Sequence, residues 1–432
     1  MKHLSKLFGV LFAFLLLAAV GCKGPAGDPG ATGANGKDGG NGKDGANAGF
    51  VYFDGFKDSL KCATCHTPGI DTTFYVAGRK TEWNNSKHNI GGDIDRNAAN
   101  CAGCHTTEGF LDRVRMKFST QFATSEKLHP SAPGCFACHA PHGNGNFALR
   151  DSSAVTLTNV FVGGTDKQFD GGYKSNLCVK CHQPRNVSAV TPAPNVNAAA
   201  TDTLTITSTR WYQHYGVQAQ MFLGTTGNGG FQFPGYTYSN SGHTTLITTK
   251  GLGCIDCHMQ NPVGGGAAKA GGHTMWLEYE AEGNKTVIVK NCKKCHDDIT
   301  SSPTTFSLSR ANFDKYKNNA VATIEAKLDT LAGLLMDTLI TKKWTAGTRK
   351  VTGQTVSVPW LSKSINAEGE ASYSILAGSV SGVTYPSIKA LPATKAGALW
   401  NFMLIEHDRS NGVHNYQYAK SLLDASIAEL KK

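Results

Sequence analysis

The cysteines of this chain constrain its fold more than any other residue type. Thirteen occur in 432 residues, and twelve of them form six pairs spaced Cys-x-x-Cys. Each pair is followed immediately by histidine, although the whole chain contains only 15 histidines. Neither chance nor a disulfide framework produces that regularity. The six copies, called motifs one to six in chain order, are Cys62-Ala-Thr-Cys65-His66, Cys101-Ala-Gly-Cys104-His105, Cys135-Phe-Ala-Cys138-His139, Cys178-Val-Lys-Cys181-His182, Cys254-Ile-Asp-Cys257-His258 and Cys292-Lys-Lys-Cys295-His296.

Cys-x-x-Cys-His is the attachment sequence for haem c. The two thiols bond to the haem vinyl groups, and the histidine reaches the iron as its proximal axial ligand. A zinc ribbon or a thioredoxin-like redox pair is the alternative for a single copy, but neither requires a histidine after every pair. The sequence therefore predicts six covalently bound haem c groups, with the proximal ligands His66, His105, His139, His182, His258 and His296.

The second axial position of each iron decides between an electron carrier and a catalyst, because an open position lets a substrate bind. Eight histidines lie outside the motifs and the N-terminal segment, which is enough for six irons. His142 is too near His139 to reach the other face of the same haem, so it is expected to serve a neighbouring one. His129 and His407 lie in polar contexts and are expected to be solvated. The predicted distal ligands are His88, His142, His214, His243, His273 and His414.

The N-terminus has the layout of a secretory signal peptide over residues 1–21, with Lys2 and Lys6 before an apolar run from Leu7 to Val20. Cys22 follows directly, as in a lipoprotein cleavage box, although Ala19 stands where leucine is usual. We expect lipidation at Cys22, with an ordinary signal peptide as the alternative. No later stretch is apolar over the length of a spanning helix, so membrane attachment is expected to depend on Cys22.

Glycine recurs at every third position from Gly24 to Gly45, within a predicted tether over residues 22–50. Only glycine fits the axis of a collagen triple helix, which gives this period a physical meaning. Pro25 and Pro29 are the only prolines of the repeat, so the segment is interpreted either as a flexible spacer or as a trimerising stalk.

Residues 51–300 are predicted to form a hexahaem domain with little regular structure, apart from a hairpin over residues 275–289. Residues 301–432 are predicted to form a C-terminal helical domain. Apolar residues at helical spacing predict helices over 311–343, 393–406 and 415–430, with a turn at Asn411-Gly412 between the last two. The Thr, Ser, Val and Gly content of residues 348–390 predicts a β-prone insertion.

Charge does not point to nucleic acid. The formal net charge is +10, but removal of Lys2 and Lys6 and the propionates of six haems bring the balance close to neutral. No glycine-rich phosphate loop accompanies the basic residues.

The chain resembles the multihaem c-type cytochromes on the outer surface of metal-respiring bacteria, and it shares features with the pentahaem nitrite reductase and octahaem hydroxylamine oxidoreductase superfamily. The resemblance rests on motifs two, three and five and on the contexts of five predicted distal histidines, such as Trp83-Asn-Asn-Ser-Lys-His88 and Gly412-Val-His414-Asn, and it carries the distal role over to all six. It implies a mainly α fold with much irregular coil, a haem-filled core and a C-terminal helical segment. No Cys-x-x-Cys-Lys site occurs, so the lysine-ligated catalytic haem of the nitrite reductases has no counterpart.

The expected function is electron transfer, without an enzymatic activity, to extracellular acceptors such as metal oxides, other cytochromes or electrodes. The expected location is the outer membrane, as a lipoprotein on the cell surface or the periplasmic face. Expected partners are redox cytochromes, and a homotrimer or a filament is a further possibility. The alternative function is a multihaem reductase of a small nitrogen or sulfur oxyanion with one open haem.

Overall fold

The computed structural model describes residues 66, 73–91, 94–184, 194–195, 201–262, 269–281, 283–301, 306–316, 318–343, 348–351, 354–365, 371–380 and 383–432. The chain divides into two compact units, Met1–Asn47 and Ala48–Lys432, and every described residue belongs to the second. The predicted signal peptide, Cys22, the glycine repeat, Cys62 and Cys65 lie outside the described residues.

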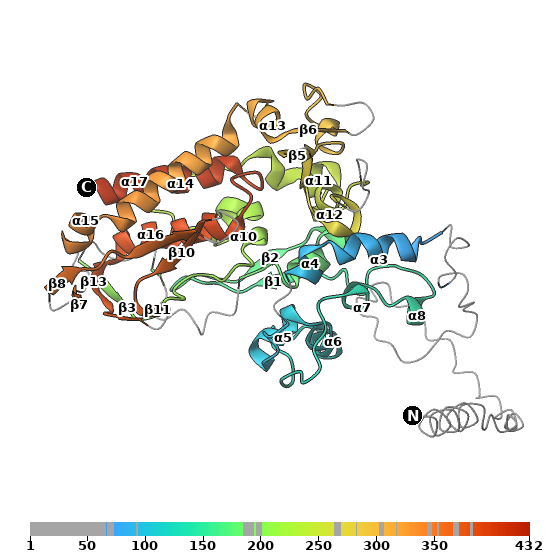
Figure 1. Cartoon of the computed structure of the whole chain (residues 1–432), viewed down its shortest axis with the longest axis horizontal. Coiled ribbons are helices and arrows are strands. Elements are labelled where there is room, and N and C mark those ends of the chain that lie inside the picture. The colour runs from blue at the N-terminus through green and yellow to red at the C-terminus, as the bar shows by residue number, and fades with distance from the viewer. Residues whose placement is uncertain are drawn as a thin grey trace, which may run out of the picture. The chain divides into compact units, whose positions relative to one another are not determined.

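Short elements joined by irregular coil make up the part of the chain that carries the motifs (Figure 1). Polar caps begin several of the helices: the Ser86 hydroxyl accepts from Asn89 N at 3.3 Å, and the Thr106 hydroxyl accepts from Gly109 N at 3.0 Å. The helices here are α3 (Val76–Asn84), α4 (Lys87–Ile90), α5 (Ala99–His105), α6 (Thr107–Arg115), α7 (Cys135–Cys138), α8 (Pro141–Asn144), α9 (Asn176–Val179), α10 (Gln218–Leu223), α11 (Leu246–Lys250) and α12 (Cys254–His258), with single 3₁₀ turns at η1 (Gly172–Lys174), η3 (Gly224–Thr226), η4 (Gly242–Thr245), η5 (Gly272–Thr274) and η6 (Cys292–Lys294).

The described strands pair only in small antiparallel sheets. The predicted hairpin over residues 275–289 is confirmed as β4 (Glu278–Ala281) with β5 (Asn284–Ile288), to which β6 (Ser307–Ser309) adds a third strand. Residues 348–392 contain further short strands, and the last of them pairs back with residues 203–206. The other strands are β1 (Val155–Leu157), β2 (Lys167–Phe169), β3 (Thr203–Ile206), β7 (Thr348–Val351), β8 (Gln354–Ser357), β9 (Leu361–Ile365), β10 (Ala371–Ile375), β11 (Gly378–Val380), β12 (Val383–Tyr385) and β13 (Ile388–Pro392). The fold is therefore mixed, and the expectation of a mainly α fold is confirmed only in part.

The C-terminal helices differ from prediction in one place. The single helix predicted over 311–343 is wrong: the structure has α13 (Arg310–Tyr316), α14 (Ala320–Met336) and α15 (Thr338–Lys343). The left-handed backbone of Asn318 and Asn319, with φ of 53° and 56°, ends the first helix. The other two predicted helices are confirmed as α16 (Ala393–Asp408) and α17 (Tyr416–Lys431). Asn411 and Gly412 form the predicted turn between them, with φ of 47° and 85°.

The largest apolar cluster of side chains among the described residues lies at the C-terminal helices. Helices α14, α16 and α17 pack side by side (Figure 1), and their apolar faces enclose aromatic residues from the segment between motifs four and five. Trp211 and Trp400 are fully buried there, with ring centres 5.2 Å apart. This core takes residues from both sides of the predicted domain boundary at residue 300, which stays a prediction. None of the described helices is both long and apolar enough to cross a membrane.

Asn401 ties this core together through its amide. It accepts from Phe231 N at 2.6 Å, donates to Phe231 O at 2.9 Å, and donates to the Ser426 hydroxyl at 3.0 Å, all fully buried. Asn401→Leu would leave both backbone groups of Phe231 unpaired, so we expect the free energy of unfolding in urea to fall by about 3 kcal/mol. Ser421→Ala, which removes only a hydroxyl bonded to its own helix, is expected to change it by less than about 0.5 kcal/mol. Equal effects of the two variants would contradict the assignment.

Candidate haem sites

Motifs two to six, which the structure describes in full, lie on or beside short turns of helix. Motifs two, three and five lie on α5, α7 and α12, motif four begins on α9, and motif six lies on η6. In motif five, the Asp256 carboxylate accepts from Gly253 N at 2.7 Å and so fixes the start of the helix. The ten described cysteines are free thiols, and they stand for the thioethers that haem attachment would form.

Each proximal histidine faces one histidine from a distant segment. The six partners are the six residues that the sequence analysis selected as distal ligands. His142 faces His66 and not His139, which lies in its own segment. The ring centres of the pairs are 6.1–6.3 Å apart: His66 with His142, His105 with His214, His139 with His273, His182 with His88, His258 with His414, and His296 with His243.

This spacing is too wide for direct ring stacking and fits a metal ion between the rings. Metal–imidazole bonds are about 2 Å long and each ring nitrogen lies about 1 Å from its ring centre, so two opposed imidazoles on one ion have centres about 6 Å apart. The angle between the two ring planes varies from 31° at His66 and His142 to 80° at His88 and His182. The geometry therefore suits six irons, each held between two imidazoles.

Second hydrogen bonds orient several of these rings. Nδ1 of His243 lies 2.7 Å from Val413 O, Nδ1 of His258 lies 3.0 Å from Met275 O, and Nδ1 of His139 lies 3.3 Å from Ala148 O. An acceptor at Nδ1 leaves Nε2 unprotonated and available to a metal, which is the arrangement typical of ligating histidines.

Two further rings have side-chain acceptors. His182 Nδ1 lies 3.1 Å from the Gln218 amide oxygen, and His414 Nδ1 lies 2.7 Å from the Asp408 carboxylate. Gln218 and Asp408 were missed by sequence reasoning. They carry no motif, and only the folded chain brings them to these rings.

Burial lowers the pKa of several of the paired histidines and so favours their neutral form. It lowers the pKa of His88 to about 4, with help from the nearby His182, and it lowers the pKa of His258 to about 4. His414 is the exception: burial opposes its protonation, but the Asp408 carboxylate outweighs burial and raises its pKa. Neutral imidazole is the form that binds a metal.

The two histidines that were not selected as ligands differ in their surroundings. His129 is exposed, as predicted. The prediction of a solvated His407 is wrong, because its side chain is buried on the inner face of α16. Its ring centre lies 4.2 Å from that of Tyr215 and 4.6 Å from that of Tyr212, and burial lowers its pKa to about 3. The neighbouring charged residues suggested solvent, but His407 lies on the same face of the helix as the buried Trp400 and Met403.

The cysteines of motif four contact those of three other motifs. The Arg113 guanidinium lies 3.3 Å from Cys104 Sγ and 3.9 Å from Cys181 Sγ, and it donates to Lys180 O at 2.8 Å. Cys178, the first cysteine of motif four, lies close to Cys254 of motif five.

Motif three completes the junction around motif four. Cys138 and Cys181 both pack against one apolar cluster that contains Phe110 and Leu177. Motif four is therefore in contact with motifs two, three and five. Motif six lies against motif five, where the Asn291 amide donates to Asp256 O.

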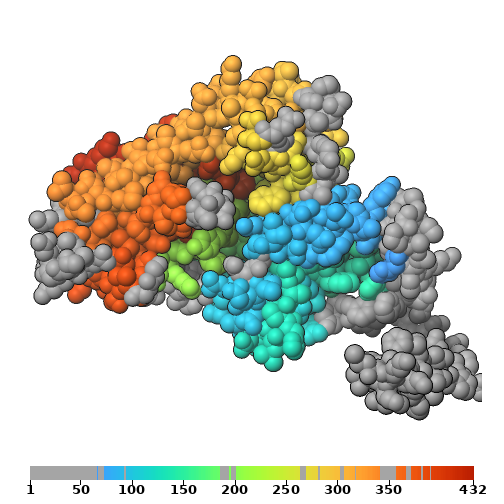
Figure 2. All heavy atoms as spheres, viewed as in Figure 1, coloured from blue at the N-terminus to red at the C-terminus, as the bar shows by residue number. Residues whose placement is uncertain are grey.

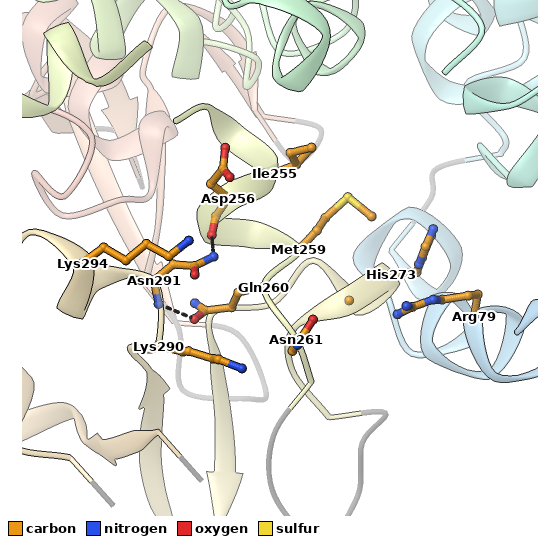
Figure 3. A pocket seen from close by; sticks show the side chains of 11 residues that line it. Arg79, Ile255, Asp256, Met259, Gln260, Asn261, His273, Lys290, Asn291 and Lys294 are labelled. Carbon is orange, nitrogen blue, oxygen red and sulfur yellow. Dashed lines mark hydrogen bonds between the residues drawn. The ribbon is translucent and has the colours of Figure 1, made fainter. Parts of the chain in front are cut away.

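A cavity of about 580 Å³ opens beside His273, between motif five and motif six (Figure 3). Arg79, Lys290 and Lys294 line it, and the carboxylate of Asp256 is paired with Lys174 at 3.2 Å. The lining is thus positively charged, which suits carboxylates such as haem propionates. In Figure 2 the described surface is hollowed near its centre, where residues of the C-terminal segment (dark red) are seen between the orange, yellow and blue segments.

Comparison with known proteins finds similarity to a cytochrome with several haems. No family model matches the chain. A C-type polyheme cytochrome, OmcC, of Geobacter sulfurreducens is 23% identical over 320 residues, which cover 68% of this chain and 36% of the relative. Homology supports a multihaem c-type cytochrome. The chain thus spans about a third of the length of that relative. Among solved structures, the outer cell wall cytochrome OcwA matches with a TM-score of 0.37 and 19% identity, over 82% of this chain and 50% of that one.

Proposed function

We propose that this multihaem cytochrome is a hexahaem electron-transfer protein. The observation that carries the proposal is the set of six histidine pairs, each spaced for one iron between two imidazoles. Bound haem supplies one-electron oxidation and reduction at iron. The cysteines would hold it covalently, and the two histidines of each pair would fill both axial positions. Since no axial position is then left for a substrate, this arrangement favours electron transfer over oxyanion reduction.

The contacts among the cysteines support a branched order of the six sites. Motif four is the junction, because its cysteines contact motifs two, three and five. Motif six is connected to motif four through motif five. Motif one is connected to motif four through motif three. His142, the partner of His66, also packs on Phe136 of motif three, with ring centres 5.4 Å apart. Because haem c is bonded directly to these cysteines, the order of the motifs sets which groups are neighbours.

The proposal includes a location and partners. Lipidation at Cys22 would attach the protein to the outer membrane, and the glycine repeat over residues 22–50 would set its reach from the surface. The acceptors would be redox cytochromes, metal oxides or an electrode. Haem attachment to paired thiols fits an exported chain, because those thiols would otherwise form disulfides in an oxidising compartment.

Electron paramagnetic resonance of the fully oxidised protein, with haem counted by mass spectrometry, tests the proposal. We expect six haems per chain, all low-spin, and no high-spin signal. The reduced protein should then transfer its electrons to ferric iron or to an electrode. One stoichiometric high-spin haem that binds and turns over nitrite or hydroxylamine would overturn the proposal and establish the reductase.

A further inference from the structure

Asp408 stands out among the groups that face the histidine pairs. It is the last residue of α16, and its side chain is completely buried, with no exposed surface. One carboxylate oxygen lies 2.7 Å from His414 Nδ1, and the other accepts from the Ser410 hydroxyl. In the part of the chain that the structure describes, His414 is its only ion-pair partner within 4.0 Å. A carboxylate with no exposed surface thus lies one imidazole away from the position that an iron would take.

Four other rings among the described residues face Nδ1 acceptors that differ from Asp408 in charge. His139, His243 and His258 face backbone carbonyls, and His182 faces the Gln218 amide. These groups are neutral. His258 and His414 form one pair, so motif five combines a neutral acceptor on one ring with a carboxylate on the other.

Glu82 is a second carboxylate that lies near the Nδ1 atom of a paired histidine, but an arginine beside it offsets its charge. Its carboxylate lies 3.4 Å from His273 Nδ1, but it also pairs with Arg79 at 3.2 Å and accepts from His273 N at 2.8 Å. A guanidinium beside the carboxylate cancels much of its field at the ring. Asp408 has no such cation beside it among the described residues, so its effect on its own pair is expected to be larger.

We propose that Asp408 gives the haem held by His258 and His414 the lowest reduction potential of the six. The inference rests on the proposed function. A carboxylate that accepts from Nδ1 makes the imidazole a more basic ligand, and a buried negative charge stabilises ferric over ferrous iron. Both effects act in the same direction. The haem of motif five therefore accepts an electron last, which places an energetic step between motif four and motif six.

Asp408→Asn tests this inference by a redox titration followed in the visible spectrum. Asparagine keeps the size and an accepting oxygen but removes the charge. We expect the component that titrates at the lowest potential, equal to one haem, to move to higher potential, while the other components move much less. Ser410→Ala provides a second variant of opposite sign. It removes a donor from the same carboxylate and leaves more charge on the oxygens, so that component should move to lower potential.

Asp424→Asn is the matched control, because Asp424 is a partly exposed carboxylate on α17 that pairs with Lys327 and Lys420. It should move no single component. The inference is overturned if Asp408→Asn leaves the lowest component in place or moves a different one, or if Ser410→Ala moves it upward. The haem count and spin state of the same samples distinguish a failure of this inference from a failure of the proposed function. The latter would show as fewer than six low-spin haems in the unmodified protein.

Discussion

His88→Ala is expected to convert one of six low-spin haems into a high-spin haem with an open axial position. His88 is the ring that faces His182 of motif four at 6.2 Å, and alanine offers no ligand in its place. The change should appear as a new high-spin signal equal to one haem. Cyanide should then bind the variant in a one-to-one ratio and should not bind the unmodified protein.

His129→Ala is the control for this experiment. His129 is exposed, and the described structure places no proximal histidine opposite it, so its loss should leave all six haems low-spin. His407→Ala is informative in another way: it is expected to weaken the packing around Tyr212 and Tyr215 without opening any iron. The assignment of His88 fails if its variant stays fully low-spin, or if His129→Ala gives the same high-spin signal.

Removing the attachment site of motif four, by Cys178→Ala with Cys181→Ala, is expected to divide the array. The variant should carry one haem fewer. Because motif four contacts motifs two, three and five, its loss separates the branch of motifs one and three from that of motifs five and six. After a short pulse that reduces only part of the haem, electrons should redistribute between the two branches slower by orders of magnitude. Transient absorption spectroscopy measures this rate directly.

Cys292→Ala with Cys295→Ala provides the matched control, since motif six lies at the end of its branch against motif five. This variant also loses one haem, but the remaining five stay connected, and redistribution among them should keep its normal rate. Equal slowing in both variants, or none in the variant of motif four, would refute the branched order.

The sequence predicted those parts of the fold whose signals are local. The period of apolar residues located α16 and α17, and the Asn411-Gly412 turn between them follows from residues that tolerate positive φ. The same period wrongly predicted one continuous helix across Asn318 and Asn319. These two left-handed residues end a helix without interrupting the apolar pattern around them. The pairing of β3 with β13 could not be predicted, since no local signal links strands so far apart.

The candidate site divides in the same way. Cys-x-x-Cys-His carries its chemistry within five consecutive residues, so attachment and the proximal ligand could be inferred from sequence. Counting and local context selected six further histidines, but which faces which depends on tertiary structure alone. The polar neighbours of His407 led to a wrong prediction of exposure, because its position on the buried face of α16 decides its burial. Asp408 and Gln218 had no signal at all, since an isolated carboxylate or amide acquires its role only from the ring beside it.

The histidine pairs also bear on how the chain can mature. Even the pair nearest in sequence, His243 and His296, joins separate segments across a hairpin and a motif. A haem that is bonded to one segment and ligated by another is a cross-link that closes a long loop. One such link lowers the conformational entropy of the unfolded chain and so stabilises the folded state by about 4 kcal/mol. The whole net stability of a domain is about 5–15 kcal/mol. Haem insertion and the folding of the motif region are therefore expected to be a single process, and this region is expected to have no stable fold in a chain that is exported without its haems.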